Sequence, residues 1–473
     1  MPAIRYVCLS DLHLGADNSV LTAIKPGSIE TDPARPSAVL SQFALCLREL
    51  LAHNEAPEKP TLILNGDILE LALTDVNKAA MVFERFIELI FPRDGEALFQ
   101  KDILYIPGNH DHHVWESARE TEYLRRIESL QPGDAIDAPH HTTKMISPSL
   151  VREPFLTGLL RVYPHLRDAT VNIAYPNYAL LSQDGRKCVI FSHGHYIESI
   201  YSLMTILNTV VFPGRKRPTV IAEVEAENFA WIDFLWSTLG RSGDVGQNMG
   251  LLYAKMQDNQ QIGKLTSNIV SALLARANQS RPLKAVEAYH LEWIVRSMFD
   301  KIRPLEKQQT THLLGDDATR GLQWFVQDVL LEQLTGENNQ VIPPDISFLF
   351  GHTHKPFQQV MSFSGYPIPL KVYNNGGWVV DTVNVSPLHG AAVLLIDEAL
   401  ETVSVRMYNQ AANPRDYAVR VEGLSPSDTA QSVFLSEVTA SVTDARDPWK
   451  AFSEVVAEAV GAHERLLRTK INL

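Results

Sequence analysis

The sequence is poor in cysteine: among 473 residues there are only three, Cys8, Cys46 and Cys188. Their number is odd, no two of them have Cys-x-x-Cys spacing, and each lies in an apolar stretch typical of a buried strand or helix. We therefore expect reduced thiols in a cytoplasmic protein, which excludes a disulfide-stabilised secreted domain.

Long apolar runs and basic blocks are also missing. No apolar run reaches the roughly 20 residues that cross a bilayer, and residues 1–5 lead directly into a predicted strand, so we expect neither a membrane helix nor a signal peptide. The formal net charge is -13. Because no basic block offsets this charge, we expect no surface for duplex nucleic acid, whereas a small phosphorylated substrate is compatible with it.

Short apolar runs that end in turn or polar residues predict buried strands at 4–9, 61–64, 103–106, 189–191, 346–350 and 370–373. Helical patterns separate the early runs, and two further strands are predicted near the end of this region, at 391–396 and 402–407. This order predicts an α/β fold in which two sheets are flanked by helices, an α/β sandwich.

The same patterns suggest a core that is interrupted twice. Residues 1–195 and 343–412 are expected to form the core. Within the first of these segments, residues 112–178 carry clusters of Pro, His and Asp and are expected to form a loop insertion near the substrate.

Residues 196–342 are expected to form a helical cap insertion, because they contain long amphipathic stretches at 222–239, 251–278 and 283–299. The remaining residues, 413–473, are expected to pack on the outside of the core as a C-terminal extension.

Five polar motifs follow predicted strands, and their side chains suit metal ions. The motifs are Asp-Leu-His at 11–13, Asn-Gly-Asp at 65–67, Gly-Asn-His-Asp at 108–111, His-Gly-His at 193–195 and Gly-His-Thr-His at 351–354. Because ligands of open α/β sheets bind beyond the carboxyl ends of the strands, these loops can converge. Oxygen and imidazole donors without thiolates argue against a structural zinc site and favour catalytic Mn, Fe or Zn.

Taken in order, the motifs resemble the DxH, GD, GNHD, HGH and GHxH motifs of the calcineurin-like metallophosphoesterases. The resemblance covers residues 4–111, 189–195 and 346–407 but not the two insertions. It implies a two-sheet α/β/β/α sandwich and two divalent ions that share Asp67 as a bridge. By this resemblance, Asp11, His13, Asp67 and His354 hold one ion, and Asp67, Asn109, His193 and His352 hold the other.

The resemblance also implies an activity, the hydrolysis of a phosphomonoester, phosphodiester or pyrophosphate bond in a small molecule by a metal-bridging hydroxide. His110 is then placed beside the leaving oxygen as the catalytic acid. Three weaker candidates for contacts with the ligands or the substrate are Asp111, His195 and Asn375, each of which is equally compatible with an ordinary loop or turn residue.

Two alternatives remain at this point. A non-catalytic scaffold of the same fold would bind a partner, although seven intact ligands and His110 count against it. The second alternative is a hydrolase of a lipid-linked nucleotide. Bacterial hydrolases of UDP-diacylglucosamine also carry a helical insertion over the metals, although they usually have Arg at the position of His110. Residues 197–218 combine an apolar run with a basic cluster and could contact a membrane, although a packed cap or a dimer contact is favoured.

Overall fold

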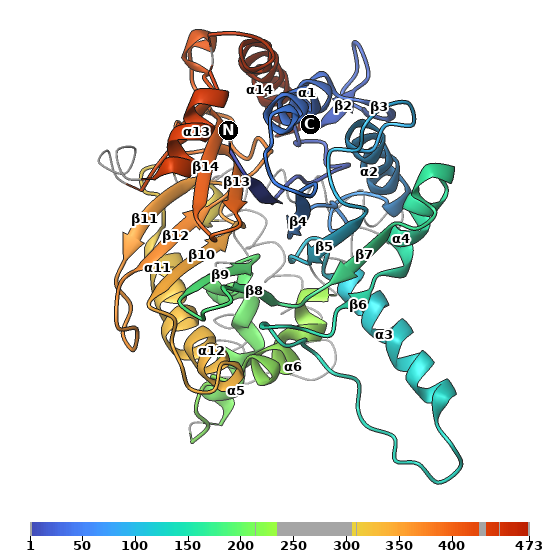
Figure 1. Cartoon of the computed structure of the whole chain (residues 1–473), viewed down its shortest axis with the longest axis vertical. Coiled ribbons are helices and arrows are strands. Elements are labelled where there is room, and N and C mark those ends of the chain that lie inside the picture. Colours follow the sequence, from blue (N-terminus) through green and yellow to red (C-terminus); the bar gives the residue numbers. More distant parts are fainter. Residues whose placement is uncertain are drawn as a thin grey trace, which may run out of the picture.

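The chain forms two main sheets, of which the first is large and mixed (Figure 1). The computed structural model describes residues 2–212, 214–233, 305–308, 310–424, 432–443 and 445–471. The strand order of the large sheet is β15 (Arg420–Glu422), β14 (Thr402–Asn409), β13 (Gly390–Asp397), β1 (Ile4–Leu9), β4 (Thr61–Asn65), β5 (Asp102–Ile106), β7 (Thr170–Ile173) and β6 (Val151–Arg152).

The second sheet has the order β11 (Phe357–Met361), β12 (Leu370–Asn374), β10 (Asp345–Phe350), β9 (Lys187–Ser192) and β8 (Asn177–Leu181). A separate hairpin joins β2 (Thr22–Ile24) to β3 (Thr31–Pro36). In the large sheet β1, β4, β5 and β7 are parallel, and in the second sheet β9, β10 and β12 are parallel. The carboxyl ends within each parallel set therefore lie at one edge of the sheet.

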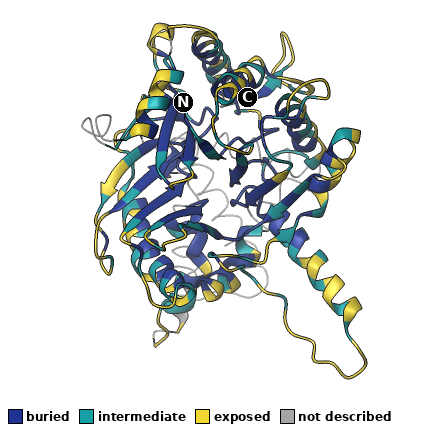
Figure 2. Ribbon diagram, in the orientation of Figure 1, coloured by how far each residue is buried: buried dark blue, intermediate teal, exposed yellow. Residues whose placement is uncertain are grey.

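The two sheets face one another across a shared apolar cluster. Side chains of successive strand residues point to opposite faces, and in β1 Cys8 points into this cluster while Val7 and Leu9 join the core on the other face. Phe191 of β9 and Leu349 of β10 reach the same cluster from the second sheet. The central strands, such as β4, β9, β10 and β13, are largely buried, as the dark ribbons in Figure 2 show.

Helices cover the outer faces of both sheets. The large sheet packs against α1 (Ala38–Ala52), α2 (Val76–Ile90), α4 (Pro154–Arg161), α13 (Val433–Ser441) and α14 (Trp449–Ile471). The second sheet packs against α5 (Leu203–Val211), α6 (Ile221–Ile232), α11 (Asp316–Trp324) and α12 (Leu331–Glu337), with a π-helical turn at Phe325–Leu330. A short helix, α10, spans Leu305–Gln308. The prediction of a mixed α/β fold is confirmed.

Local sequence explains where these helices form. In α2 the buried residues Ala79, Phe83, Phe86 and Ile90 recur at three- and four-residue spacing, so one face of the helix is apolar. The α1 helix begins after Ser37, whose side chain accepts a hydrogen bond from the Leu40 N–H as an N-cap.

The expected loop insertion over 112–178 needs correction. It contains α3 (His112–Ser129), α4 and the sheet strands β6 and β7. Only Val114, Trp115 and Ala118 form an apolar contact face on α3, near its start, so the polar remainder of this helix resembled a loop in sequence. The strand β7 has only four residues, which is too short to give a clear strand pattern in the sequence.

The described parts of residues 196–342 are largely helical. Towards the end of this segment, Leu322, Phe325 and Val329 pack on Phe348 and Val372 of the second sheet, so these helices cover the sheet itself. The amphipathic stretches at 251–278 and 283–299, and the end of the stretch at 222–239, lie outside the described residues.

The start of the apolar run at residue 197 is packed inside the molecule, whereas Met204 and Phe212 further along it are exposed. Ile197, Ile200 and Tyr201 are buried in the same cluster, and the Arg217 guanidinium lies 3.2 Å from the centroid of the Trp324 ring. Across the described ranges, no helix is both long enough and apolar enough to span a membrane.

Candidate metal centre

The five motif loops meet at the carboxyl ends of β1, β4, β5, β9 and β10. Five of the predicted ligands have positive φ angles, which are uncommon for residues other than glycine: Asp11 (52°), His13 (45°), Asp67 (51°), His352 (68°) and His354 (59°). Such backbone conformations cost free energy and collect at functional sites.

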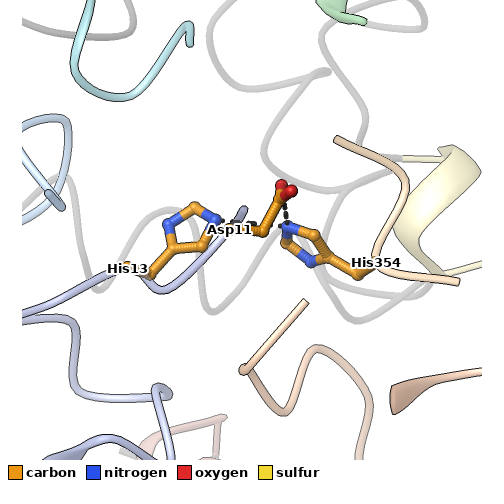
Figure 3. A group of neighbouring side chains, drawn as sticks. All are labelled: Asp11, His13 and His354. Carbon is orange, nitrogen blue, oxygen red and sulfur yellow. Dashed lines mark hydrogen bonds and ion pairs between the residues drawn. The ribbon is translucent and has the colours of Figure 1, made fainter. Parts of the chain in front are cut away.

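The first cluster contains Asp11, His13 and His354, all buried (Figure 3). The Nε2 atoms of His13 and His354 lie 3.2 Å apart, and His354 Nε2 lies 3.4 Å from Asp11 Oδ1. Asp67 Oδ2 approaches His13 Nε2 at 3.7 Å. Four potential ligand atoms therefore surround one position.

Two carboxylates determine which nitrogen of each imidazole faces this position. His13 Nδ1 lies 2.9 Å from Glu70 Oε2, and His354 Nδ1 lies 2.5 Å from Asp381 Oδ2. An ionised carboxylate can only accept a hydrogen bond, so in both rings Nδ1 carries the proton and Nε2 presents a lone pair. Two lone pairs that face each other at 3.2 Å suit a shared cation.

The second cluster contains Asp67, Asn109, His193 and His352. His193 Nε2 lies 3.3 Å from Asp67 Oδ2, 3.1 Å from Asn109 Oδ1 and 3.3 Å from His352 Nδ1. His193 Nδ1 faces the Asn65 carbonyl oxygen at 3.4 Å, and His352 Nε2 lies 2.7 Å from Glu198 Oε1. In both rings one nitrogen faces the cluster and the other lies near an oxygen atom outside it.

Asp67 belongs to both clusters. Its Oδ1 accepts a hydrogen bond from the His110 N–H at 2.8 Å, whereas Oδ2, fully buried, has no hydrogen-bond partner among the described residues. Oδ2 instead faces His13 on one side and His193 on the other. A buried carboxylate oxygen rarely stays without a partner, so this observation fits residues that would share two cations through one bridging carboxylate.

The chain's own charges favour cations here. Burial opposes ionisation of Asp67, but the neighbouring His193 and His110 outweigh this effect and hold the pKa of Asp67 well below its usual value. Burial also disfavours the His193 imidazolium, yet Asp67 raises the pKa of His193 to about 9. Asp67 is therefore ionised, and its negative charge stabilises a neighbouring positive charge.

No protein-family model and no curated protein matches the chain.

Two glycines let the ligand loops approach each other. A Cβ added to Gly66, which has a φ of +85°, would lie 2.3 Å from His193 Nδ1, and one added to Gly108 would lie 2.3 Å from Asp67 Oδ1. Any side chain at these positions would displace a ligand of the second cluster, so the glycines are part of the geometry.

His110 lies beside the first cluster, with its ring centroid 4.8 Å from that of His13. Its Nδ1 lies 2.9 Å from Glu70 Oε1, so Glu70 binds both histidines through its two oxygens. Burial would raise the pKa of Glu70, but His110 and His13 outweigh it and lower this pKa far below its usual value, so the carboxylate is ionised.

The weaker candidates have different roles. Asp111 accepts hydrogen bonds from the N–H groups of Gly108 (2.6 Å) and Ile68 (2.7 Å), so it joins two ligand loops through their backbone. Asn375 donates from Nδ2 to the Cys8 carbonyl at 3.2 Å and does not reach the ligands. His195 is buried at a ring-centroid distance of 5.8 Å from His193, and neither of its nitrogens has a hydrogen-bond partner in the described part of the chain.

Sequence reasoning missed four residues that contact the ligands: Glu70, Asp381, Glu198 and Tyr201. Glu70 stands three residues after Asp67, so an acidic residue at the end of the same short loop was a usable signal. No pattern marks the other three, which reach the ligands only through the fold. Burial raises the pKa of Glu198 to about 7, with Glu306 adding to the effect.

Proposed function

We propose that this protein is a dinuclear-metal phosphoesterase with the α/β/β/α sandwich of the calcineurin-like metallophosphoesterases. The observation that carries the proposal is the position of Asp67 Oδ2, buried between two clusters of potential ligand atoms and without a hydrogen-bond partner among the described residues. Asp11, His13, Asp67 and His354 would hold one ion, and Asp67, Asn109, His193 and His352 the other. Mn, Fe and Zn are the ions that suit these donors.

When bound, a divalent metal pair neutralises phosphate charge and lowers the pKa of bound water towards about 7, which yields hydroxide at neutral pH. The chain itself supplies the proton for the leaving group. Because His110 Nδ1 is engaged by Glu70, a proton given to the leaving oxygen would depart from Nε2. Glu70 orients this ring through its contact with Nδ1.

The substrate class we propose is a small phosphorylated molecule. The chain has a net charge of -13, and a nucleic-acid surface depends on Lys and Arg to neutralise phosphates. A metal site at the carboxyl ends of strands can instead recognise one phosphate group by coordination.

The test combines metal analysis with turnover. Purified protein should contain, or take up, two equivalents of Mn²⁺, and Mn²⁺ should stimulate hydrolysis of bis-p-nitrophenyl phosphate or p-nitrophenyl phosphate. Asp67→Asn should take up neither ion stably and should lose activity in parallel. A wild-type protein that binds no metal and hydrolyses neither compound in Mn²⁺, Fe²⁺ or Zn²⁺ would overturn the proposal.

A further inference from the structure

The segment that follows His193 contacts, among the predicted ligands and within the described part of the chain, those of the second cluster. It consists of two short 3-10 turns, His195–Ile197 and Ser199–Ser202, at the start of the insertion. Glu198 Oε1 lies 2.7 Å from His352 Nε2, and the Tyr201 hydroxyl accepts a hydrogen bond from Asn109 Nδ2 at 3.1 Å. The Tyr201 ring also packs edge-on against His352, with centroids 5.0 Å apart.

We propose that this segment selects the metal-binding forms of His352 and Asn109, with Glu198 and Tyr201 as positioning residues for the second ion. The inference rests on the proposed metal centre and deepens it. It assigns to the start of the insertion control over one of the two ions.

For His352 the choice is between tautomers. The Glu198 carboxyl group lies 2.7 Å from His352 Nε2 but makes no hydrogen bond with it. A negative charge on Glu198 favours the tautomer that carries its proton on Nε2, which leaves Nδ1 with a lone pair. Nδ1 is the atom that faces His193 Nε2 at 3.3 Å. Without Glu198, nothing in these contacts would favour this tautomer over the one that places a proton between the two imidazoles.

For Asn109 the choice is between two orientations of the amide. The hydrogen bond to Tyr201 takes Nδ2, which leaves Oδ1 facing His193 Nε2 at 3.1 Å. The opposite orientation would direct N–H groups at a cation and would repel it, because the amide nitrogen has no lone pair to offer. The Tyr201 hydroxyl therefore stabilises the orientation that can coordinate.

The first cluster is oriented independently of this segment. His13 is held by Glu70, in the loop after β4, and His354 is held by Asp381, in the loop after β12. Changes at Glu198 or Tyr201 should consequently affect one ion and spare the other. A change at Asp381 should do the reverse.

Calorimetric titration of metal-free protein with Mn²⁺ at pH 8 tests this separation. Glu198→Ala and Tyr201→Phe should each weaken one of two equivalents, by about 10- to 100-fold for loss of an outer partner of a metal ligand. Glu198→Gln, which keeps an oxygen acceptor, should restore most of the affinity. Asp381→Ala should weaken the other equivalent, and the double variant of Glu198 and Asp381 should weaken both.

Absorption spectra of the Co²⁺-loaded proteins add a readout that does not depend on turnover. The Glu198→Ala spectrum should lose the same contribution as that of Asn109→Ala, a direct deletion in the second cluster. If wild type binds two ions and both Glu198→Ala and Tyr201→Phe keep both affinities, the inference is overturned while the metal centre stands. Loss of both equivalents in a variant with unchanged circular dichroism also overturns it. If wild type binds fewer than two ions, the proposed function itself fails.

Discussion

One carboxylate, Glu70, links a predicted ligand to the predicted acid, since its two oxygens contact His13 and His110 at 2.9 Å each. These two histidines have different roles in the proposal, so a substitution at each should have a distinct result. His110 contributes no ligand atom to either cluster that we assign to a metal, whereas Glu70 supports one ring of each kind.

We predict that His110→Ala keeps two Mn²⁺ equivalents and lowers kcat by about 10²- to 10⁴-fold, the usual contribution of a general acid. Metal content by mass spectrometry and turnover of bis-p-nitrophenyl phosphate measure the two effects separately. Glu70→Ala serves as the comparison, because it should lower both metal affinity and rate. A His110→Ala protein that loses its metals would refute the assigned role.

Single site residues could be predicted from the sequence where they lie within one motif. Asp11, His13, Asp67 and His354 follow strands directly, and the structure brings them together with the other three predicted ligands. It failed for Asp381, which reaches His354 from a loop far along the chain and becomes identifiable only when the sheets are in place. Burial and hydrogen bonding between distant segments leave no periodic signal in the sequence.

Among the helices, α14 packs on Trp378, a residue that is hydrogen-bonded to the backbone of the first cluster. Phe452 of this helix is fully buried, with its ring centroid 6.2 Å from that of Trp378 and 6.5 Å from that of Phe43 in α1. The backbone N–H of Trp378 donates a hydrogen bond to the Asp11 carbonyl oxygen at 3.0 Å. The C-terminal helix therefore packs on the residue that fixes the backbone of a ligand.

We predict that Phe452→Ala lowers the free energy of unfolding by about 3–5 kcal/mol, the usual cost of removing a buried phenyl ring. Lys450→Ala on the exposed side of the same helix is the matched control and should change stability by less than about 0.5 kcal/mol. Urea denaturation followed by circular dichroism measures both. Equal effects of the two substitutions would show that α14 unfolds separately from the core.

The α6 helix buries a carboxyl group beside the loop that follows β7. Glu225 is fully buried and its Oε2 accepts a hydrogen bond from the Tyr175 hydroxyl at 3.2 Å, just beyond the end of β7. Burial raises the pKa of Glu225 to about 8, in spite of the opposing effect of the Tyr196 and Tyr175 hydroxyls. Its ordinary value is 4.5.

A pH dependence of stability follows from this difference. Between pH 4.5 and about 8 the folded state keeps a proton that the unfolded state releases, so the free energy of unfolding falls as pH rises through this window. We predict that Glu225→Gln removes this slope and is the more stable protein at pH 8.5, by about 1.4 kcal/mol for each pKa unit recovered. Urea denaturation at several pH values from 5 to 8.5 measures the free energy of unfolding of both proteins, and Glu223→Gln at an exposed position is the control. Parallel curves for wild type and Glu225→Gln would contradict the prediction.

Most elements that position the site were predictable, because short apolar runs within β1 and β10 carry a clear strand signal. The elements missed between residues 112 and 178 lack one: α3 has a short apolar face, and β7 places only Val171 and Ile173 in the core. Such weak patterns acquire a structure from the sheet edge on which they pack.

For the whole molecule, the proposed centre is a junction between the two sheets. Asp11, Asp67 and Asn109 follow strands of the large sheet, whereas His193, His352 and His354 follow strands of the second sheet. Each cluster takes ligands from both sheets. Bound ions would therefore cross-link the layers of the sandwich as well as supply chemistry.

This arrangement predicts that metals stabilise the entire fold. An ion held at a free concentration of about 100 times its Kd adds about 2.7 kcal/mol to the folded state, so removing the ions with EDTA should lower the melting temperature by about 5 °C or more. Scanning fluorimetry in EDTA, followed by addition of excess Mn²⁺, should show the loss and its recovery. Asp67→Asn should melt at the same temperature in both conditions because its bridging carboxylate is gone. An equal response of wild type and Asp67→Asn to EDTA would place the stabilising metal elsewhere and contradict a shared centre between the sheets.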